Sequence, residues 1–399
     1  MSRPVFICAG LRTPFGRHGG ALAAIRTDDL AALPLTALMQ QWPSVNWEAL
    51  DEVILGCANQ AGEDNRDVAR MALLLAGLPL SVPGVTVNRL CSSGLEAVGQ
   101  AARAIRCGEA ELILAGGVES MTRSPYVLSK AEGPYAKDQK LEDTTLGWRC
   151  INPRMKVLHG TESNTETAEN LARELGISRA DQDAYAWRSQ ARTAAAGALL
   201  AEELIPVAVR AGRETRIMDE DEHPRPDTTL EQLARLKPLL GSEGTVTAGN
   251  ASGLNDGACA LLLASEAAMH KHGLSPLARV GGLASAGVPP RTMGIGPVPA
   301  IHKLLAREGR TLDDFDHIEI NEAFAAQVLA CLRGLGLPDE APNVNPHGGA
   351  IALGHPLGAS GARLCLHAAL NLHRGGANRA LVSLCVGVGQ GLALSLDRA

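Results

Sequence analysis

The chain has 399 residues, of which 46% are apolar, 20% are charged and 3% are aromatic, and its formal net charge is −6. This is the balance of a folded globular protein, and the length allows about two or three domains. No Lys/Arg-rich run offers a surface for a phosphate backbone, and no apolar run is long enough to span a bilayer. We therefore expect neither a nucleic-acid partner nor a membrane anchor.

Nine cysteines are spread through the chain without any CxxC pair, and no His pair stands at zinc-finger spacing. This spacing predicts no structural metal site. The first residues lack the charged region, the long apolar stretch and the cleavage site of a signal peptide. We expect reduced thiols and a cytoplasmic location.

Short apolar runs predict buried strands, and Ala-rich stretches with helical spacing alternate with them. The predicted strands are residues 5–8, 52–55, 85–87, 111–114, 317–320 and 380–384, and the clearest helices are residues 95–105 and 362–372. Such alternation predicts the α/β class, with parallel sheets that helices cover on both faces.

A weak internal repeat relates the two halves of the chain. In each half a turn opens an Ala-rich helix, which leads through glycine to an apolar strand; the turns hold Cys91 and His355. Any two βαβ units look partly alike, so this alternative stays open. If the halves are duplicates, the two turns are expected to meet at one site.

The composition changes between the halves, from Met121 to about Lys237, and includes a charged, Pro-rich stretch at residues 219–226. The change predicts an inserted, largely irregular or helical loop domain. Long insertions in compact domains usually serve binding or cover a site.

Cys91 is the first candidate for chemistry, because it follows a predicted strand and precedes Ser92, Ser93 and Gly94 at a helix start. Free N–H groups and the helix dipole there are expected to lower the pKa of the thiol. The alternative is a buried cysteine that packs as a small hydrophobe. This feature alone does not decide between them.

His355 lies in a stretch rich in Gly and Pro, NPHGGAIALGHPLG, which predicts a tight turn. A His in such a turn can accept a thiol proton near neutral pH, although it could instead donate to a nearby carbonyl. His347, in the same stretch, is not expected to act directly.

Cys385 follows the last predicted apolar strand, and the glycines after it leave backbone N–H groups free to face a ligand. It could exchange a proton or be a core residue. Asn321, after the strand at residues 317–320, could hold a water, while Glu322 could cap a helix.

Six segments together resemble the thiolase family, in the family's order and over nearly the whole chain. They are NRLCSSGLEAV, GGVESM, TVTAGNASGLNDGA, NEAFA, GGAIALGHPLGASGAR and CVGVGQG. The resemblance implies two similar βαβαβαββ halves in a layered α-β-α-β-α arrangement plus a loop domain. The halves would be residues 1–120, continued at 244–270, and 271–399. Residues 121–243 would form the loop domain, with CoA and oligomer contacts in a homodimer or homotetramer.

The resemblance also implies a role for each candidate. Cys91 would be the acyl-carrying nucleophile, His355 would activate it, and Cys385 would exchange the proton at C2 of the acetyl unit. Asn321 would hold a water that forms one oxyanion hole with His355. The backbone N–H groups of Cys91 and Gly387 would form the other. No metal and no permanently bound cofactor are implied.

Coenzyme A would be a co-substrate that lies along the loop domain. The positions that match CoA-contacting residues of the family are Arg225, Leu240, Ala248, Ser252 and Phe324. The chain departs from the usual pattern at Ser163-Asn164, at CSSG in place of CGSG, and at His347. These departures bear on substrate preference more than on reaction type.

Three segments, GCANQAGEDNRDVARMALLLAGLP, LEDTTLGWRCINPRMK and DEHPRPDTTLEQLARLKP, look like those of thiolases that act on 3-oxoadipyl-CoA in aromatic degradation, the β-ketoadipate pathway. The products would be succinyl-CoA and acetyl-CoA. That substrate ends in a carboxylate, which Arg149, Arg154 or Lys156 could bind. Alternatively, this loop joins subunits and its charges are solvated.

Other functions stay open at this point. A general acetoacetyl-CoA thiolase is the nearest alternative. Cys385 argues against a ketosynthase-type condensing enzyme. A non-catalytic lipid carrier would be expected to lose Cys91, His355 or Cys385, and the chain keeps all three.

Overall fold

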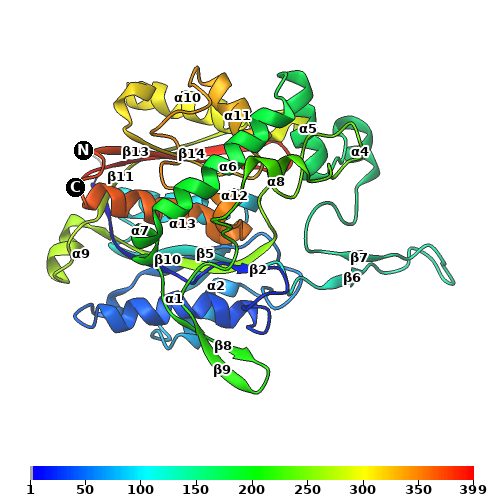
Figure 1. Ribbon diagram of the computed structural model, residues 1–399. Coiled ribbons are helices and arrows are strands. Elements are labelled where there is room, and N and C mark those ends of the chain that lie inside the picture. The colour runs from blue at the N-terminus through cyan, green and yellow to red at the C-terminus, as the bar shows by residue number, and fades with distance from the viewer. Residues whose placement is uncertain (1–2) are drawn as a thin grey trace.

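Helices and sheet regions stack in the order α-β-α-β-α in the computed structural model, which describes residues 3–399 (Figure 1). One outer layer is α1 (Thr27–Gln41) with α2 (Val68–Leu75), and the other is α10 (Pro297–Glu308) with α11 (Ala325–Gly334). The middle layer is α3 (Ser93–Cys107) packed against α13 (Leu357–His373). The layered α/β arrangement expected from the sequence is confirmed.

The main sheet has the strand order β12-β13-β14-β11-β1-β10-β5-β3-β4, with the short β2 (Gly16–Arg17) paired to β10. The first half supplies β1 (Val5–Arg12), β3 (Glu52–Gly56), β4 (Gly84–Val87), β5 (Leu112–Ser120) and β10 (Asn255–Ser265). The second half supplies β11 (Ala278–Gly287), β12 (His317–Ile320), β13 (Arg379–Val386) and β14 (Gln390–Asp397). The two halves join where Phe6 and Ile7 of β1 pair with β11.

The expectation of parallel sheets is wrong, because the sheet is mixed. β3 runs parallel to β4 and β5, and β12 runs parallel to β13. In contrast, β10 is antiparallel to β1 and β5, and β14 is antiparallel to β11 and β13. The turn at residues 387–389 returns β13 directly into β14, and so short a connection permits only antiparallel pairing.

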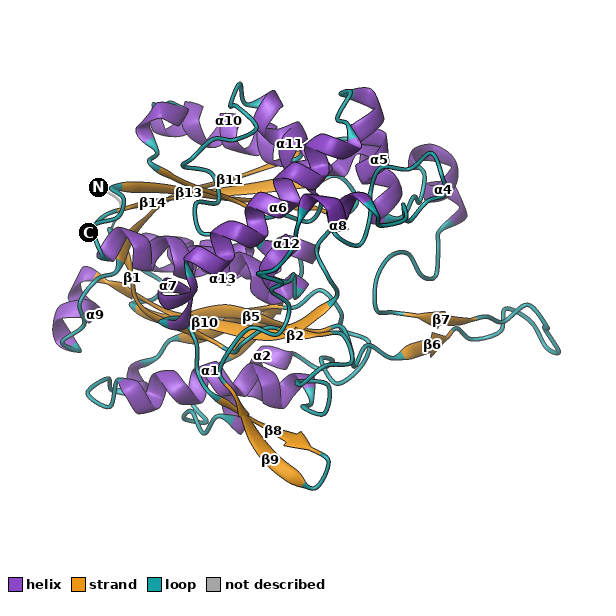
Figure 2. Cartoon of the chain, viewed as in Figure 1, coloured by secondary structure: helices purple, strands orange, loops and turns teal. Residues whose placement is uncertain are grey.

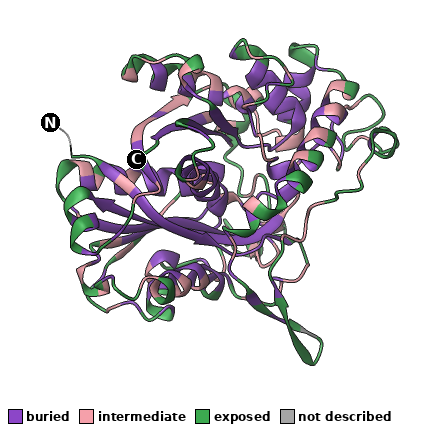
Figure 3. Ribbon diagram, turned by 60° about the vertical axis from the view of Figure 1, so that its left-hand side comes forward, coloured by how far each residue is buried: buried purple, intermediate pink, exposed green. Residues whose placement is uncertain are grey.

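The layers are built from aliphatic and small side chains, as the low aromatic content requires. All residues of β5 and β10 are buried, and α13 is buried nearly all round because sheet regions lie on both sides of it. Figure 3 shows this buried centre and the exposed outer helices and hairpins. None of the helices in residues 3–399 combines the length and the apolarity that a membrane crossing needs.

Glycines allow the starts of α3 and α13 to meet. A Cβ on Gly94 would lie 2.5 Å from the carbonyl oxygen of Gly358, and a Cβ on Gly117 would lie 1.9 Å from the same oxygen. Both distances are too short for any side chain, so only glycine permits this approach of backbone to backbone. The turn with Cys91 and the turn with His355 are thereby brought to one place.

The insertion between β5 and β10 is more ordered than the sequence suggests. It holds hairpins β6 (Tyr126–Leu128) with β7 (Leu141–Asp143) and β8 (Val207–Ala211) with β9 (Glu214–Met218), and helices α4 (Pro153–His159), α5 (Asn164–Glu174), α6 (Arg179–Ala195), α7 (Gly197–Ala201) and α8 (Leu230–Ala234). Capping boxes at Ser163, Ser178 and Thr229 begin α5, α6 and α8. The two hairpins project from the layered body (Figure 2). The remaining short helices are α9 (Glu266–Lys271) and α12 (Ala350–Leu353).

Candidate active site

A tight turn between β4 and α3 presents the thiol of Cys91. The Leu90 N–H donates to Asn88 Oδ1 at 2.9 Å, and the Arg89 N–H donates to Ser93 Oγ at 2.8 Å. The Ser93 hydroxyl donates in turn to the Leu90 carbonyl at 2.7 Å. Leu90 takes a positive φ of 47°, which is uncommon outside glycine, so these bonds hold a sharp bend just before the thiol.

His355 is fixed by a second turn, at the start of α13. Its N–H donates to Asn255 Oδ1 at 2.9 Å, and its ring Nδ1 lies 2.6 Å from Ser360 Oγ. The Ser360 hydroxyl donates its single proton to the Pro356 carbonyl at 3.0 Å, so it accepts from His355 Nδ1–H. This leaves Nε2 of His355 with a free lone pair, which is the state a general base requires.

Asn321 lies directly after β12, and its backbone N–H donates to the Ser383 carbonyl of β13 at 2.9 Å. Its side-chain Nδ2 lies 3.3 Å from His355 Nε2. Both side chains are buried. The Asn321 amide can donate, and His355 Nε2 can donate once it has taken up a proton, so the two can then bind one oxygen atom.

Cys91, His355 and Cys385 line one small cavity of about 50 Å³, which we call the inner cavity; Ser252, Phe324, Met121 and Met293 are also in its wall. Cys385 is the penultimate residue of β13. The backbone N–H of Gly387, in the turn after β13, is directed at the Cys91 thiol and favours its anion. Residues that are distant in sequence thus meet at the starts of two helices and the end of a strand.

Burial decides the ionisation of this site. It raises the pKa of Cys91 to about 11 and lifts the pKa of Cys385 well above its usual value, and it lowers the pKa of His355 to about 4. The expectation that the helix start lowers the pKa of Cys91 is wrong, because desolvation outweighs the N–H groups of Gly387 and Cys91 itself. At neutral pH the site holds neutral thiols beside a neutral imidazole.

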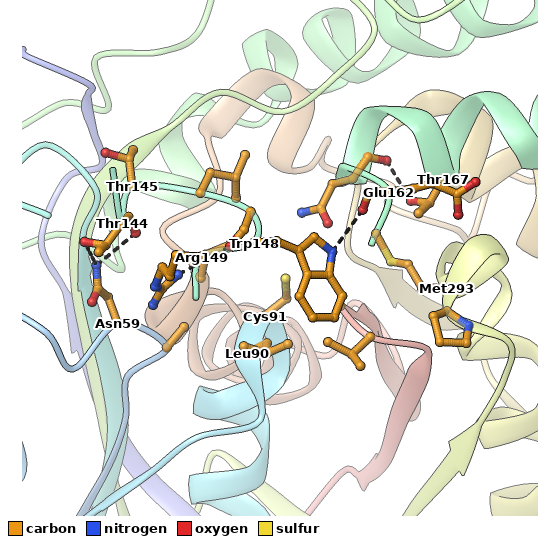
Figure 4. A pocket seen from close by; sticks show the side chains of 18 of the residues that line it. Asn59, Leu90, Cys91, Thr144, Thr145, Trp148, Arg149, Glu162, Thr167 and Met293 are labelled. Carbon is orange, nitrogen blue, oxygen red and sulfur yellow. Dashed lines mark hydrogen bonds between the residues drawn. The ribbon is translucent and has the colours of Figure 1, made fainter. Parts of the chain in front are cut away.

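A wider pocket of about 300 Å³ leads outward from Cys91, and we call it the outer pocket. Its wall includes Leu90, Asn59, Glu119, Gly387 and the loop at residues 144–149. In Figure 4, Cys91 lies between Arg149 and Trp148. The Trp148 Nε1–H donates to the Glu162 carbonyl at 3.1 Å, which fixes the indole.

The guanidinium of Arg149 lies in this outer pocket and is only partly exposed. Its Nη1 donates a long hydrogen bond of 3.4 Å to the Gly147 carbonyl. Within residues 3–399 it joins no ion pair with a carboxylate. Its charge is therefore available to an anionic group of a ligand.

The residues predicted to contact coenzyme A fall into two groups. Ser252 and Phe324 line the inner cavity, where the Ser252 N–H donates to the Ala323 carbonyl at 3.0 Å. Arg225, Leu240 and Ala248 are exposed, and they line neither the inner cavity nor the outer pocket.

Glu119 is a buried residue of this site that the sequence reasoning missed. Its carboxylate accepts from the N–H groups of Ala58, Asn59 and Gly358 at 2.8 to 3.0 Å. It thus joins β5 to the end of β3 and to the start of α13, while burial raises its pKa to about 7. A charged residue inside the apolar run of β5 was the signal that could have revealed it.

Glu322 caps a helix from a distance. Its carboxylate accepts from the Tyr185 hydroxyl at 3.0 Å, from Ser189 at 2.6 Å, and from the Ile351 N–H at the start of α12 at 3.1 Å. Asn345 donates to the same carboxylate at 3.1 Å. The sequence analysis also missed Ser360, which fixes the tautomer of His355. Ser360 is only five residues after His355, at the start of α13.

Known proteins resemble this chain over its whole length. Residues 5–267 match the family described as thiolase, N-terminal domain, and residues 274–398 match thiolase, C-terminal domain. A beta-ketoadipyl-CoA thiolase of Pseudomonas aeruginosa is 63% identical, with 100% of both chains covered. A 3-oxoadipyl-CoA/3-oxo-5,6-dehydrosuberyl-CoA thiolase of Escherichia coli is 58% identical, with 99% of this chain and 100% of that protein covered.

Solved structures give the same fold. The human mitochondrial 3-ketoacyl-CoA thiolase has a TM-score of 0.92 at 42% identity, with 100% of this chain and 99% of that chain covered. The acetyl-CoA acetyltransferase of Bacillus anthracis has a TM-score of 0.91 at 41% identity, with coverage of 100% and 99%.

Proposed function

The chain belongs to the thiolase family of acyltransferases, and we propose that it cleaves 3-oxoadipyl-CoA with CoA to give succinyl-CoA and acetyl-CoA. The observation that carries the chemistry is the inner cavity, which Cys91, His355 and Cys385 line together. The substrate rests on the full-length relatives at 63% and 58% identity, whose names specify 3-oxoadipyl-CoA or its synonym.

In the first half-reaction His355 Nε2 takes the proton of the Cys91 thiol, and the thiolate attacks the C3 ketone of the substrate. The C2–C3 bond then breaks, its electron pair leaves as the acetyl-CoA enolate, and the succinyl group stays on Cys91 as a thioester. Cys385 gives the enolate its proton at C2. A neutral thiol beside a neutral base suits this coupled transfer, because no ion pair must form before substrate binds.

In the second half-reaction the thiol of free CoA gives its proton to Cys385, which lost one to the enolate, and attacks the thioester on Cys91. Succinyl-CoA leaves, and His355 returns its proton to the Cys91 sulfur, which restores the thiol. Because acetyl-CoA leaves before free CoA reacts with the succinyl group on Cys91, the kinetics should be ping-pong.

Each half-reaction places negative charge on an oxygen. Asn321 would hold a water, and this water and the protonated His355 would together bind the enolate oxygen, a role supported by the closeness of the two side chains. The N–H groups of Gly387 and Cys91 would stabilise the oxyanion at C3, a role supported by the direction of the Gly387 N–H toward the Cys91 thiol.

Coenzyme A would lie along the loop domain, residues 121–243. The two halves of the fold would be residues 1–120 with 244–270, and residues 271–399. Ser252 and Phe324 would contact its thiol end, and Ala248, Leu240 and Arg225 its exposed length. The match to the human mitochondrial 3-ketoacyl-CoA thiolase in complex with CoA covers 100% of this chain and 98% of that chain, which supports CoA as a ligand of this fold. Arg149 would bind the distal carboxylate of the acyl group.

Two further features are proposals of the same kind. A homodimer or homotetramer is supported by the projecting β6–β7 hairpin, whose Tyr126, Leu128 and Leu141 are 59 to 68% exposed although they are apolar.

A reducing compartment such as the cytoplasm is supported by the nine cysteines, all of them free thiols.

The experiment is a comparison of kcat/KM on 3-oxoadipyl-CoA and on acetoacetyl-CoA. We expect 3-oxoadipyl-CoA to be the better substrate by about tenfold or more, because a charge-assisted hydrogen bond to its carboxylate contributes about 1.5–3 kcal/mol. Equal or better turnover of acetoacetyl-CoA would replace the proposal with a general acetoacetyl-CoA thiolase.

A further inference from the structure

Three imidazoles gather in the core, where β12, α13 and the loop before α12 meet. The ring centroids of His347 and His367 lie 5.0 Å apart, and each lies 5.9 Å from the ring of His317. His317 and Glu319 alternate with Ile318 on β12, so they face the same side. His317, Glu319 and His367 are fully buried, and the proposed chemistry uses none of them.

The hydrogen bonds orient this cluster inward. His367 Nδ1 donates to the carboxylate of Glu203, which can only accept, so His367 Nε2 carries its lone pair toward His347 Nδ1 at 2.9 Å. His317 Nε2 donates to Glu319 Oε1 at 2.7 Å. A carboxylate behind the far nitrogen of a His is how proteins commonly fix a metal-binding imidazole.

The cluster also has unused capacity for a cation. Among the residues described, Glu319 Oε2 has no hydrogen-bond partner although the side chain is fully buried. In the surrounding network Arg12 pairs with Glu203 and Asp221, and Arg363 pairs with Glu203, whereas within residues 3–399 no ion pair joins Glu319 to an arginine. The buried carboxylate of Glu319 therefore has no arginine to offset its charge directly, and a bound cation would offset it.

We propose that His317, Glu319 and His367 bind a divalent transition-metal ion of the zinc type, with the ring of His347 beside them. One ligand atom from each of the three lies within 4.8 Å of the others. A tetrahedral zinc ion with bonds of about 2.0–2.2 Å needs its donors about 3.4 Å apart, so small shifts of the rings suffice. Two imidazoles and a carboxylate are donors that suit zinc, cobalt and nickel.

Binding at His317 Nε2 replaces its hydrogen bond to Glu319 by a metal ion that both residues share, and Nδ1 can keep its own partner. The ring would shift its proton from Nε2 to Nδ1, which lies 2.6 Å from the Asn371 amide. An Asn amide offers a donor at one end and an acceptor at the other, so it can serve either tautomer. The sequence spacing predicts no metal site, since the donors come from β12 and α13, which are far apart in the chain.

A second group, Cys57, Asp64 and Glu119, is a weaker candidate for the same ion. The Cys57 thiol already donates to the Asn59 carbonyl at 2.9 Å, and the Glu119 carboxylate accepts three backbone N–H groups. Its donors are therefore committed, whereas Glu319 Oε2 is not.

The test uses the full chain with Cys91→Ser, so that the reactive thiol cannot capture metal. The protein is stripped with a chelator, dialysed against Zn²⁺ or Co²⁺ and analysed for metal content, visible spectrum and Tm. We expect one equivalent of metal, Co²⁺ d–d bands without a sulfur charge-transfer band, and a Tm that Zn²⁺ raises by several degrees.

Glu319→Gln, which keeps the shape of the side chain, and His367→Gln should each abolish binding and the rise in Tm. His373→Gln is the matched control, because His373 lies on the same helix but is exposed. No stoichiometric metal, equal metal in Glu319→Gln and the control, or a sulfur charge-transfer band would each overturn the proposal.

Discussion

The inner cavity and the outer pocket both have Cys91 in their walls, but they are built in different ways. Polar groups at the inner cavity are tied to the core: His355 to Ser360 and Asn321, and Cys385 within β13. The outer pocket is lined by a loop, residues 144–149, and its Arg149 joins no ion pair within residues 3–399. Buried strand ends and helix starts thus hold the groups of the inner cavity in place, and we propose that the loop selects the acyl group.

The strongest way to test the inner cavity is His355→Ala. Without the base, kcat/KM on 3-oxoadipyl-CoA should fall about 10²–10⁴-fold, because positioned general bases contribute that much. Since burial holds the pKa of His355 near 4, kcat/KM of the unmodified protein should fall only as the pH falls through about 4, where the imidazole becomes protonated. A pH series of initial rates measures both effects, with the exposed His302→Ala as control. A variant that keeps full activity would remove His355 from the mechanism.

Arg149→Met tests whether the outer pocket acts separately. It should lower kcat/KM on 3-oxoadipyl-CoA about 10–100-fold, from the loss of a charge-assisted hydrogen bond, and leave acetoacetyl-CoA nearly unchanged. Arg154→Met is the matched control, since Arg154 is exposed at the start of α4. If both substrates lose activity equally, Arg149 shapes the loop and does not select the substrate.

Ser360→Ala should have the smallest effect. It leaves every reacting group in place but frees His355 Nδ1, so that the ring populates both tautomers. We expect kcat to fall about tenfold with KM unchanged, and Ser360→Thr to restore it, because Thr carries the same hydroxyl. A change in KM alone, or no rescue by Thr, would contradict a positioning role.

Local sequence patterns predicted much of the fold and the members of the inner cavity. The runs at residues 5–8, 52–55 and 317–320 became β1, β3 and β12, and Cys91, His355 and Cys385 stood out at turns and strand ends. These features depend on residues that are close together in the sequence, so they can be predicted from the sequence alone.

What the sequence could not predict depends on tertiary packing. The pKa of Cys91 rises because other segments remove its water, and no local motif reports that burial. The mixed direction of the sheet depends on which strands β10 and β14 join. Likewise, His317, His347 and His367 become neighbours only when β12, a loop and α13 pack together.

The most direct test of the account is to identify the acyl group that Cys91 carries. The protein is mixed with 3-oxoadipyl-CoA without free CoA, quenched in acid and digested, and the peptide that contains Cys91 is analysed by mass spectrometry. The mechanism predicts a succinyl thioester on Cys91, which free CoA removes as succinyl-CoA. An acetyl group on Cys91, or a succinyl group on another residue, would contradict it.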